Sequence, residues 1–234
     1  MILVVNAGSS SVKFGLFSFD NLELIARGLL DWAGSATQAV MTITPKRGEV
    51  VRTQIEVHEY RSAVISGFKF FGESGLVNNH QPIRVVGHRL IHGGEEFRHP
   101  IWINSVMKKN IAKYKHLAPL HIPPGLEAIE ATQTVLANVP QVGLFDTAFF
   151  ADIPPKAYLY PVPYGWYEQW GIRRYGFHGI SHAYSTDRAT AMLEGDRSDL
   201  RLVICHLGQG SSATAVRNGK AVTNTMGFTP LDGL

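Results

Sequence analysis

Several features are scarce or missing in this sequence. Its single cysteine, Cys205, excludes an internal disulfide and indicates a reducing compartment. No apolar run reaches the roughly 18 residues that a membrane-spanning helix needs, and the first residues carry neither a basic region nor a cleavage signal. We therefore expect a cytoplasmic protein that does not enter a membrane.

Clustered positive charge is missing as well. The formal net charge is +3, and basic residues never occur more than two in a row, as at Lys108 and Lys109 or at Arg173 and Arg174. Because proteins that bind nucleic acid gather lysine and arginine on one face, this distribution argues against a nucleic acid as partner. Apolar residues make up 45% of the chain, which is enough to build a buried core.

The first stretch with a specific pattern is residues 2–19. It begins with four apolar residues, which are too few for a helix but suit a buried strand. Small and polar residues fill positions 6–11, and apolar alternation resumes at Val12, so the pattern predicts a β-hairpin. A tip of glycine and serine leaves backbone N–H groups and hydroxyls open to phosphate oxygens, and Lys13 adds a positive charge. A plain surface hairpin is the alternative.

A second copy of this pattern favours the phosphate-binding interpretation. Around position 203 the chain reads LVICHLGQGSSATAVRNGKAV, and Gly208 aligns there with Gly8. In this alignment His206 takes the place of Asn6. An internal repeat is first of all a statement about architecture. It indicates two related lobes that face one nucleotide.

The segments between the two hairpins alternate between strand and helix patterns. Further strands are expected at residues 22–30, 39–44, 50–57, 83–86 and 141–145, and helices at 60–71, at 104–116 with Asn104 as cap, and at about 123–137. Strands first, followed by alternating helices and strands, predict an α/β fold whose sheet has an antiparallel and a parallel half. Ligands of such sheets meet polar residues at strand ends, such as Asp146.

The later part of the chain contains fewer regular elements. Residues 153–171, rich in proline and aromatic residues, suggest a link between lobes. Residues 182–193 suggest a helix that Ser181 caps. In the second hairpin, Asn218 and Gly219 form a turn sequence that tolerates positive φ.

The chain stops soon after this second hairpin. A repeat that cannot bury its own apolar face is not expected to be stable alone. We therefore expect residues 1–150 to form a complete or nearly complete first lobe, and residues 151–234 to be a linker and the beginning of a truncated second lobe.

Seven blocks of the sequence together resemble the acetokinase family. They are NAGSSSVKF at 6–14, GHRLIHGGE at 87–95, LAPLH at 117–121, FDTAF at 145–149, RRYGFHGISH at 173–182, HLGQGSS at 206–212 and MGFTPLDGL at 226–234. The resemblance spans essentially the whole chain and keeps the order of the family's motifs. It implies the α/β, two-lobed fold of the sugar kinases, Hsp70 and actin, with a ribonuclease H-like lobe that has a mixed five-stranded sheet and helices, plus an incomplete second copy.

The resemblance also implies an activity. The family's reaction moves the ATP γ-phosphoryl group onto acetate, giving acetyl phosphate and ADP, reversibly and with Mg²⁺; propionate is the alternative acceptor. Arg89 would grip the carboxylate, and Asn6 would help to hold the metal. The phosphoryl group in flight would be surrounded by His121, Asp146 and His178. The nucleotide phosphates would be bound by Ser9, Ser11, Lys13, His206, Leu207, Gly208, Gln209 and Gly210.

The sequence departs from the family pattern at four motif positions. Gln209 replaces a usual asparagine, Phe150 a histidine, Ile122 an asparagine and Ile180 a threonine. The three apolar replacements could reshape the acyl pocket, lower activity or only repack it. Gln209 could still reach a phosphate, although its side chain is one methylene longer.

Residues that the family has beyond its MGFTPLDGL block are also missing. They include an arginine that stabilises the transferring phosphoryl group, the adenosine pocket and a glutamate that holds the metal. Because an arginine clamp is worth about 10³ to 10⁵ in rate, we expect the 234-residue chain alone to be nearly inactive. A complete protein would be a homodimer, whereas a truncated chain could survive as a nucleotide or phosphate binder.

Two further patterns have simpler interpretations. His88 and His92 are four residues apart, but on a strand they lack helical geometry and a third ligand, so a zinc site is disfavoured. Cys205 falls in an expected buried strand and should be inert.

Overall fold

The computed structural model describes residues 1–32, 35, 37–77, 82–193 and 199–232. The chain forms two compact units: unit 1 comprises Met1–Leu90 and Ile101–Leu144, and unit 2 comprises Ile91–Pro100 and Phe145–Leu234. The functional lobes expected at 1–150 and 151–234 stay a prediction.

Unit 1 is built around one mixed sheet of eight strands, in the order β5-β4-β3-β2-β1-β6-β8-β7. The strands are β1 Ile2–Ala7, β2 Ser11–Phe17, β3 Leu24–Asp31, β4 Gln38–Pro45, β5 Val51–Glu56, β6 Val85–Leu90, β7 Ile101–Trp102 and β8 Gln141–Phe145. The pairs from β1 to β5 are antiparallel, whereas β6 runs parallel to β1. The expected mixture of antiparallel and parallel strands is therefore confirmed.

The sheet is larger than the five strands that the family resemblance implied. Strands β4 and β5 extend the antiparallel series beyond β3, and the two-residue strand β7 pairs with β8 at the other edge. The alternating patterns at 39–44 and 50–57 do predict β4 and β5. The count of five was too low because it described the family's shared lobe and not these additional strands.

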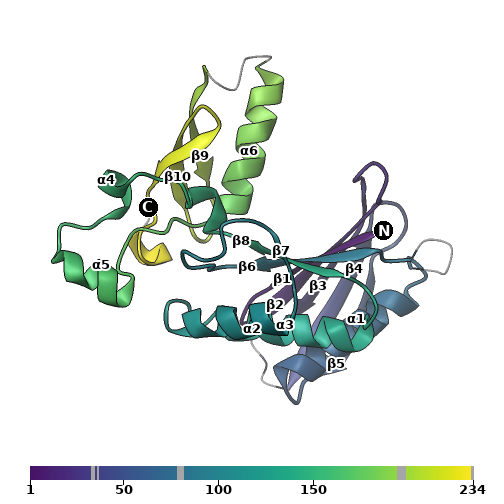
Figure 1. The fold of residues 1–234 in the computed structure, drawn as a ribbon. Helices are drawn as coiled ribbons and strands as arrows, with labels where there is room; N and C mark the ends of the chain where they lie inside the picture. The colour runs from purple at the N-terminus through teal and green to yellow at the C-terminus, as the bar shows by residue number, and fades with distance from the viewer. Residues whose placement is uncertain (33–34, 36, 78–81, 194–198, 233–234) are drawn as a thin grey trace. The chain divides into compact units, whose positions relative to one another are not determined.

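One face of the unit 1 sheet forms the main core. Side chains alternate between the two faces of a strand, and in β1 every second residue from Leu3 to Ala7 is buried. Helices α1 Tyr60–Glu73 and α3 Ile122–Val135 cover this face (Figure 1). The opposite face therefore carries the intervening side chains, among them Asn6.

The helix ends of unit 1 follow local sequence signals. Helix α2 Ser105–Ala112 and the 3₁₀ helix Lys113–His116 occupy the segment expected as one helix. The Asn104 side-chain oxygen accepts a hydrogen bond from the Met107 N–H at 2.9 Å, so the expected cap is confirmed. The last turn tightens into 3₁₀ geometry, which is frequent where α-helices end. Helix α3 has proline in its first turn, as expected.

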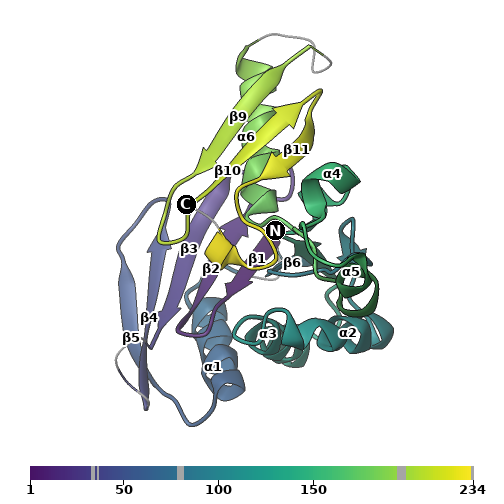
Figure 2. The same cartoon turned by 90° about the vertical axis from the view of Figure 1, so that its left-hand side faces the viewer.

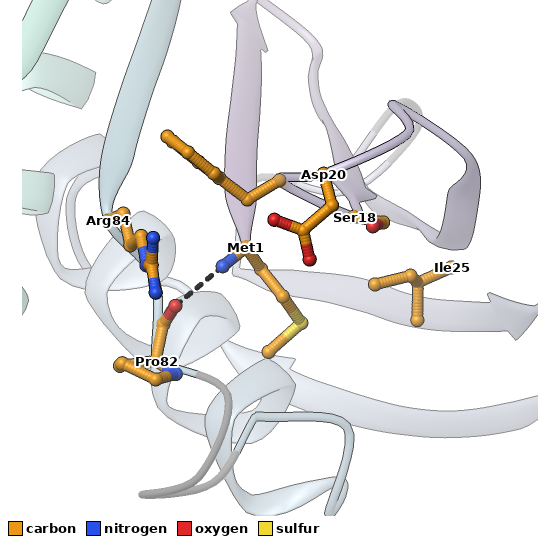
Figure 3. Close-up of a pocket in the computed structure, with 7 residues that line it drawn as sticks. Met1, Ser18, Asp20, Ile25, Pro82 and Arg84 are labelled. Carbon is orange, nitrogen blue, oxygen red and sulfur yellow. Dashed lines mark hydrogen bonds between the residues drawn. The ribbon is translucent and has the colours of Figure 1, made fainter.

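A hollow of about 490 Å³ surrounds the start of β1, at the end of the strand opposite to the hairpin tip (Figure 3). The Met1 amino group donates to the Pro82 carbonyl oxygen at 2.6 Å. Burial and, to a lesser extent, the Arg84 charge lower the pKa of this amino group, whereas Asp20 opposes the shift. Among the described residues, those that line the hollow include none that the motifs single out, so we do not place the functional site there.

Unit 2 contains a three-stranded antiparallel sheet and one long helix. Strands β9 Arg201–His206, β10 Ser212–Arg217 and β11 Lys220–Asn224 lie in the order β11-β10-β9, and helix α6 Gly179–Met192 runs along them (Figure 2). The shorter elements are α4 Pro155–Tyr158, α5 Tyr164–Trp170, and 3₁₀ turns at Ala148–Phe150 and Pro230–Asp232. In the part of the chain that the structure describes, no helix is long and apolar enough to cross a bilayer.

Helix α6 begins earlier than the sequence indicates, and Ser181 does not cap it. The N-cap position is His178, whose φ is 60°, and Gly179 donates its N–H to the Asp146 carbonyl oxygen at 2.9 Å. This acceptor comes from a segment distant in sequence and satisfies one of the N–H groups that a helix start leaves open. The Ser181 hydroxyl instead lies 2.9 Å from Nδ1 of His206.

The segment at residues 153–171 is packed within unit 2. It contains helices α4 and α5. The Arg173 guanidinium lies 3.8 Å from the centroid of the Tyr158 ring, and Arg174 donates its N–H to the Tyr158 carbonyl oxygen at 2.7 Å. Contacts of this kind order an irregular segment without a sheet or a long helix.

The second hairpin agrees with its sequence signals except at Cys205. Asn218 and Gly219 join β10 to β11 with φ values of 55° and 71°, so the predicted turn is confirmed. Cys205 is exposed, and the prediction of a buried position was wrong. Strand β9 is an edge strand, and its Cys205 face also carries Val203, which is 72% exposed. Helix α6 packs against the strand but leaves this face open.

His88 in β6 makes the stability of unit 1 depend on pH. Its side chain is buried, and Nε2 lies 2.8 Å from the Gln141 side-chain oxygen. Burial lowers the pKa of His88 from 6.5 to about 4, against the raising effect of this hydrogen bond. Below about pH 6.5 the unfolded chain binds a proton that the folded chain does not accept until about pH 4, so stability is lost in this window.

As the pH is lowered from about 6.5 to about 4, we expect the titration of His88 to decrease the free energy of unfolding by up to ~1.4 kcal/mol per pH unit. Urea unfolding curves at several pH values measure this slope. His88→Gln should lower this slope by the contribution of one titrating group. His58→Gln is the control and should leave it unchanged, because the His58 side chain is 83% exposed. An unchanged slope in His88→Gln would contradict the prediction.

Candidate functional site

The tip of the first hairpin is the candidate phosphate loop of unit 1. Strands β1 and β2 pair as far as Ala7 and Val12, and Gly8 donates its N–H to the Ser11 carbonyl oxygen at 2.9 Å. Ser9 lies exposed at this tip. The hairpin predicted from the sequence is confirmed, and its binding of phosphate stays a prediction.

Two aromatic residues that the sequence analysis did not single out hold this tip. Trp32 donates its ring N–H to the Ser9 carbonyl oxygen at 3.0 Å, and the Tyr60 hydroxyl donates to the Gly8 carbonyl oxygen at 3.2 Å. The two rings meet edge to face, with centroids 5.1 Å apart. Burial, with a smaller effect of Glu127, raises the pKa of Tyr60 and keeps its hydroxyl a neutral donor. Both bonds engage carbonyl oxygens, which would otherwise repel a phosphate.

Three expected site residues lie side by side on neighbouring strands of unit 1. Asn6 in β1 is paired with Lys13 in β2 and with Arg89 in β6. Directly paired residues point to the same face of a sheet. Arg89 Nη1 donates to the Asn6 side-chain oxygen at 3.1 Å. Two cationic side chains therefore flank one amide close to the hairpin tip.

The same face of the sheet holds a hollow of about 430 Å³. Asn6 and Lys13 line it, together with Val4, Phe17 and residues of β3 and β4. Apolar walls with a few polar groups, here also Arg27 and two threonines, are typical of small-molecule sites. Unlike the hollow around Met1, this one is lined by expected site residues.

His121 precedes helix α3 of unit 1 and is half-buried. One turn later, a Cβ on Gly125 would lie 3.1 Å from the Leu90 side chain, so the start of α3 packs on the end of β6. Because Arg89 directly precedes Leu90, His121 and Arg89 lie at the same end of β6. The register of unit 1 thus brings together Lys13, Asn6 and Arg89. A role of His121 beside them stays a prediction.

The other expected catalytic residues belong to unit 2. Asp146 follows β8 and is 1% exposed. Its carbonyl oxygen approaches Gly179 so closely that a Cβ on this glycine would lie 2.1 Å from it. The contact of the two backbones brings Asp146 next to His178.

His178 also meets the second expected histidine of unit 2. The rings of His178 and His206 stack with centroids 4.1 Å apart and planes at 29°. Nδ1 of His178 lies 2.9 Å from the Ser212 hydroxyl, and Nδ1 of His206 lies 2.9 Å from the Ser181 hydroxyl. Both serines fall inside the sequence motifs, but nothing in their spacing marks them as partners of these histidines.

The tip of the second hairpin comprises residues 207–211. The pair nearest to it is His206 with Ser212, so this tip is one residue longer than the first tip at residues 8–11. Residues 207–210, which the resemblance assigns to phosphate binding, are all exposed, and Leu207 is 75% exposed. The repeat of the hairpin is therefore confirmed, although its two copies differ in register.

The four departures from the family pattern fall in different surroundings. Phe150 is fully buried, and a Cβ on Gly176 would lie 2.6 Å from its ring. Ile122 is 3% exposed at the first position of α3, and Ile180 is half-buried in α6. Gln209 is exposed in the second tip. Phe150 and Ile122 therefore contribute to core packing, whereas Gln209 is accessible to a ligand.

Asn6 is the residue that the family resemblance assigns to a metal ion. Within the described ranges, no group of three or more histidine, cysteine, aspartate and glutamate residues is placed to hold a metal ion. An amide oxygen suits Mg²⁺, which commonly takes one or two protein ligands and completes its shell with phosphate oxygens and water. Asn6 fits such a partial role, and Arg89 orients its oxygen.

The fold defines the class of protein first: it is that of the sugar kinases, Hsp70 and actin. The chain superposes on a crystal structure of acetate kinase from Porphyromonas gingivalis with a TM-score of 0.90 at 36% identity, covering 98% of this chain and 58% of the other. A propionate kinase from Francisella tularensis gives a TM-score of 0.90 at 35% identity, covering 100% of this chain and 59% of the other.

The sequence comparisons then define the family. The model of the acetokinase family matches residues 1–234, and the chain belongs to this family. It is 43% identical over 234 residues to the acetate kinase of Carboxydothermus hydrogenoformans, and 44% identical over 235 residues to that of Desulfitobacterium hafniense. In both comparisons 100% of this chain is covered but only 59% of the relative. The chain thus spans about three fifths of the length of these relatives.

Proposed function

We propose that the product of the complete gene transfers the γ-phosphoryl group of ATP to acetate and catalyses the reverse reaction as well. The single observation that carries this proposal is the lateral row of Lys13, Asn6 and Arg89 beside the first hairpin tip. A nucleotide phosphate and a carboxylate are both anions, and this row places two fixed cations next to backbone donors of a glycine–serine tip.

The acceptor determines which chemistry the protein must supply. A carboxylate is already ionised at pH 7 and needs no general base to attack phosphorus. It needs alignment, and relief from repulsion by the triphosphate. In our proposal Arg89 supplies both, because a guanidinium can bind the two carboxylate oxygens together. Lys13, with Ser9 and Ser11, holds the nucleotide phosphates.

Charge that spreads over the phosphoryl oxygens in the transition state requires hydrogen-bond donors. We assign this role to His121 of unit 1 and to His178 of unit 2. Residues 206–210 form the second phosphate loop in this proposal. Asp146 acts by orientation and not as a base.

Mg²⁺ would be brought in with the nucleotide, with Asn6 as one protein ligand. The ion would neutralise charge on the phosphate oxygens while transfer takes place. The Asn6 amide offers an oxygen ligand but no charge, so the phosphates of the nucleotide would balance the positive charges of the ion, Lys13 and Arg89.

A second candidate is propionate as the preferred acceptor. The similarity to the propionate kinase of Francisella tularensis is as high, by TM-score, as that to an acetate kinase. One added methylene is discriminated by only about 1–3 kcal/mol in an apolar pocket. Both acids are therefore candidate substrates of the same site.

For the 234-residue chain by itself we propose near inactivity, with nucleotide or phosphate binding as its remaining property. About two fifths of the length of the relative from Carboxydothermus hydrogenoformans lies outside the matched part. For the complete protein we propose homodimers, on the basis of the family resemblance.

The test is a hydroxamate assay for acyl phosphate with ATP, Mg²⁺ and acetate, propionate or butyrate, run on the complete gene product and on the 234-residue chain. We expect acyl phosphate from the complete product, with acetate or propionate fastest, and almost none from the chain alone. No acyl phosphate from the complete product with any of the three acids would refute a carboxylate kinase. Robust turnover by the 234-residue chain would refute its inactivity.

A further inference from the structure

Unit 2 contains a buried hydrogen-bond chain in which the Ser212 hydroxyl joins two histidines. Ser212 is fully buried, and its oxygen lies 2.9 Å from Nδ1 of His178 and 2.7 Å from Nε2 of His182. His182 is one helical turn after His178 and is also fully buried. Of these three residues only His178 has a role in the proposed transfer, so Ser212 and His182 are not yet accounted for.

A single hydroxyl between two imidazole nitrogens restricts where the protons are. The Ser212 hydroxyl has one proton, and among the described residues its only hydrogen-bond partners are these two rings, so a satisfied hydroxyl donates to one ring and accepts from the other. In one arrangement His182 donates from Nε2 to Ser212, and Ser212 donates to Nδ1 of His178. In the reverse arrangement His178 donates from Nδ1, and its Nε2 is then an acceptor.

The surroundings of His182 decide between the two arrangements. Its Nδ1 is buried with no hydrogen-bond partner among the described residues. Burial first, then the nearby His178 and His206, lower the pKa of His182 to about 4, while Asp146 has the opposite effect, so the ring is neutral at physiological pH. A neutral ring carries one proton, and the reverse arrangement would place it on the unpartnered Nδ1. Buried N–H groups without a partner are rarer than unpartnered acceptors.

We propose that Ser212 and His182 are positioning residues that hold His178 in the tautomer with its proton on Nε2. His182 donates from Nε2 to Ser212, Ser212 donates to Nδ1 of His178, and Nε2 of His178 is left as an N–H donor. The two hydrogen bonds donate in the same direction, from His182 through Ser212 to His178, so each bond polarises the next. The inference rests on the proposed function for its purpose: a donor at Nε2 stabilises phosphoryl oxygens, whereas an acceptor there would repel them.

The backbone of His178 supports a fixed ring. Its φ of 60° is uncommon for a residue other than glycine, and strained conformations of this kind cluster at functional sites. Stacking on His206 restricts the ring further. With the backbone, the ring plane and Nδ1 all held, the direction of the Nε2–H bond is set before a ligand arrives.

The tautomer can be measured without any activity. We would record the ring-nitrogen chemical shifts of isotope-labelled histidine by NMR in the complete gene product, at about pH 8, where a histidine of ordinary pKa is neutral. Protonated and unprotonated ring nitrogens have well-separated shifts. The proposal predicts a protonated Nε2 and an unprotonated Nδ1 for both His178 and His182. A proton on Nδ1 of His178 overturns it, whatever the activity of the protein.

Variants separate positioning from a merely structural role. Ser212→Ala should leave His178 as a mixture of tautomers and lower kcat by about 10- to 100-fold, as loss of the residues that orient metal-ligating histidines does, with KM for acetate nearly unchanged. His182→Gln, which keeps an N–H donor toward Ser212, should retain the Nε2–H tautomer and more activity than His182→Leu. Ser181→Ala, which removes the matching bond to His206, is the control and should not change the His178 tautomer.

The outcomes separate this inference from the proposed function. A complete gene product with the Nε2–H tautomer but no acyl phosphate formation refutes the proposed function and keeps the assignment of the protons. An active product in which Ser212→Ala changes neither the His178 tautomer nor kcat refutes the positioning role and keeps the proposed function.

Discussion

Replacement of Arg89 by alanine is expected to lower kcat/KM for the carboxylate by about 10²- to 10³-fold, because loss of one partner of a buried charge pair costs about 2–5 kcal/mol. Arg89 is half-buried, and its donation to Asn6 at 3.1 Å aligns the guanidinium with the row that contains Lys13. Steady-state kinetics with the acid varied at saturating MgATP measure the change. KM for ATP should move far less.

Two further variants test whether the geometry of Arg89 matters in addition to its charge. Arg89→Lys keeps the charge but loses the planar fork, so we expect an intermediate loss. Arg52→Ala is the matched control, because Arg52 is an exposed arginine of edge strand β5 in the same sheet. If Arg52→Ala lowered kcat/KM as much as Arg89→Ala, net charge and not a specific grip would explain the result.

Gly179→Ala is expected to destabilise unit 2 by about 3 kcal/mol, the upper range for overpacking a closely packed position. The added Cβ would lie 2.1 Å from the Asp146 carbonyl oxygen and 3.0 Å from the Phe149 side chain. A backbone oxygen cannot move aside as a flexible side chain can. The substitution must therefore push the start of α6 away from Asp146 and displace His178, whose misplacement by about 1 Å can lower activity about 10²-fold.

Gly72→Ala in helix α1 is the matched control for this prediction. A Cβ on Gly72 would meet nothing within 4 Å, and alanine favours the helix over glycine by about 1 kcal/mol. Urea unfolding of both variants and the kinetics of the complete gene product measure the contrast. Equal stability of Gly179→Ala and the unsubstituted protein would show that the two backbones are not in contact.

The first hairpin shows which parts of the site can be predicted from sequence. Alternating apolar residues on both sides of a small polar tip specify the strands and the turn, because strand periodicity and turn chemistry are local properties. The same reasoning identified the second hairpin and the turn at Asn218 and Gly219, and both are present. The row of Lys13, Asn6 and Arg89 could not be predicted from local patterns alone, because the pairing of β1 with β6 sets which residues are neighbours.

The supporting residues of the site could not be predicted in this way. Trp32 and Tyr60 reach the first tip from β3's end and from α1, and no local pattern signals a hydrogen bond to a carbonyl that far away in sequence. Ser181 shows that a local signal can also predict a contact that the structure does not form. It has the right residue type for a helix cap, but His178 takes the cap position because Gly179 finds an acceptor in Asp146.

By itself, the sequence determined the mixed α/β class, the repeated hairpins, the helices of unit 1 and the family to which the chain belongs. These features depend on periodicity, turn residues and motifs, each of which is encoded within a short segment. Only the tertiary structure decided the eight-stranded sheet, the exposed face of β9 and the link from His182 through Ser212 to His178. They depend on which distant segments pack together, because burial and hydrogen-bond partners are properties of the folded chain and not of any one stretch.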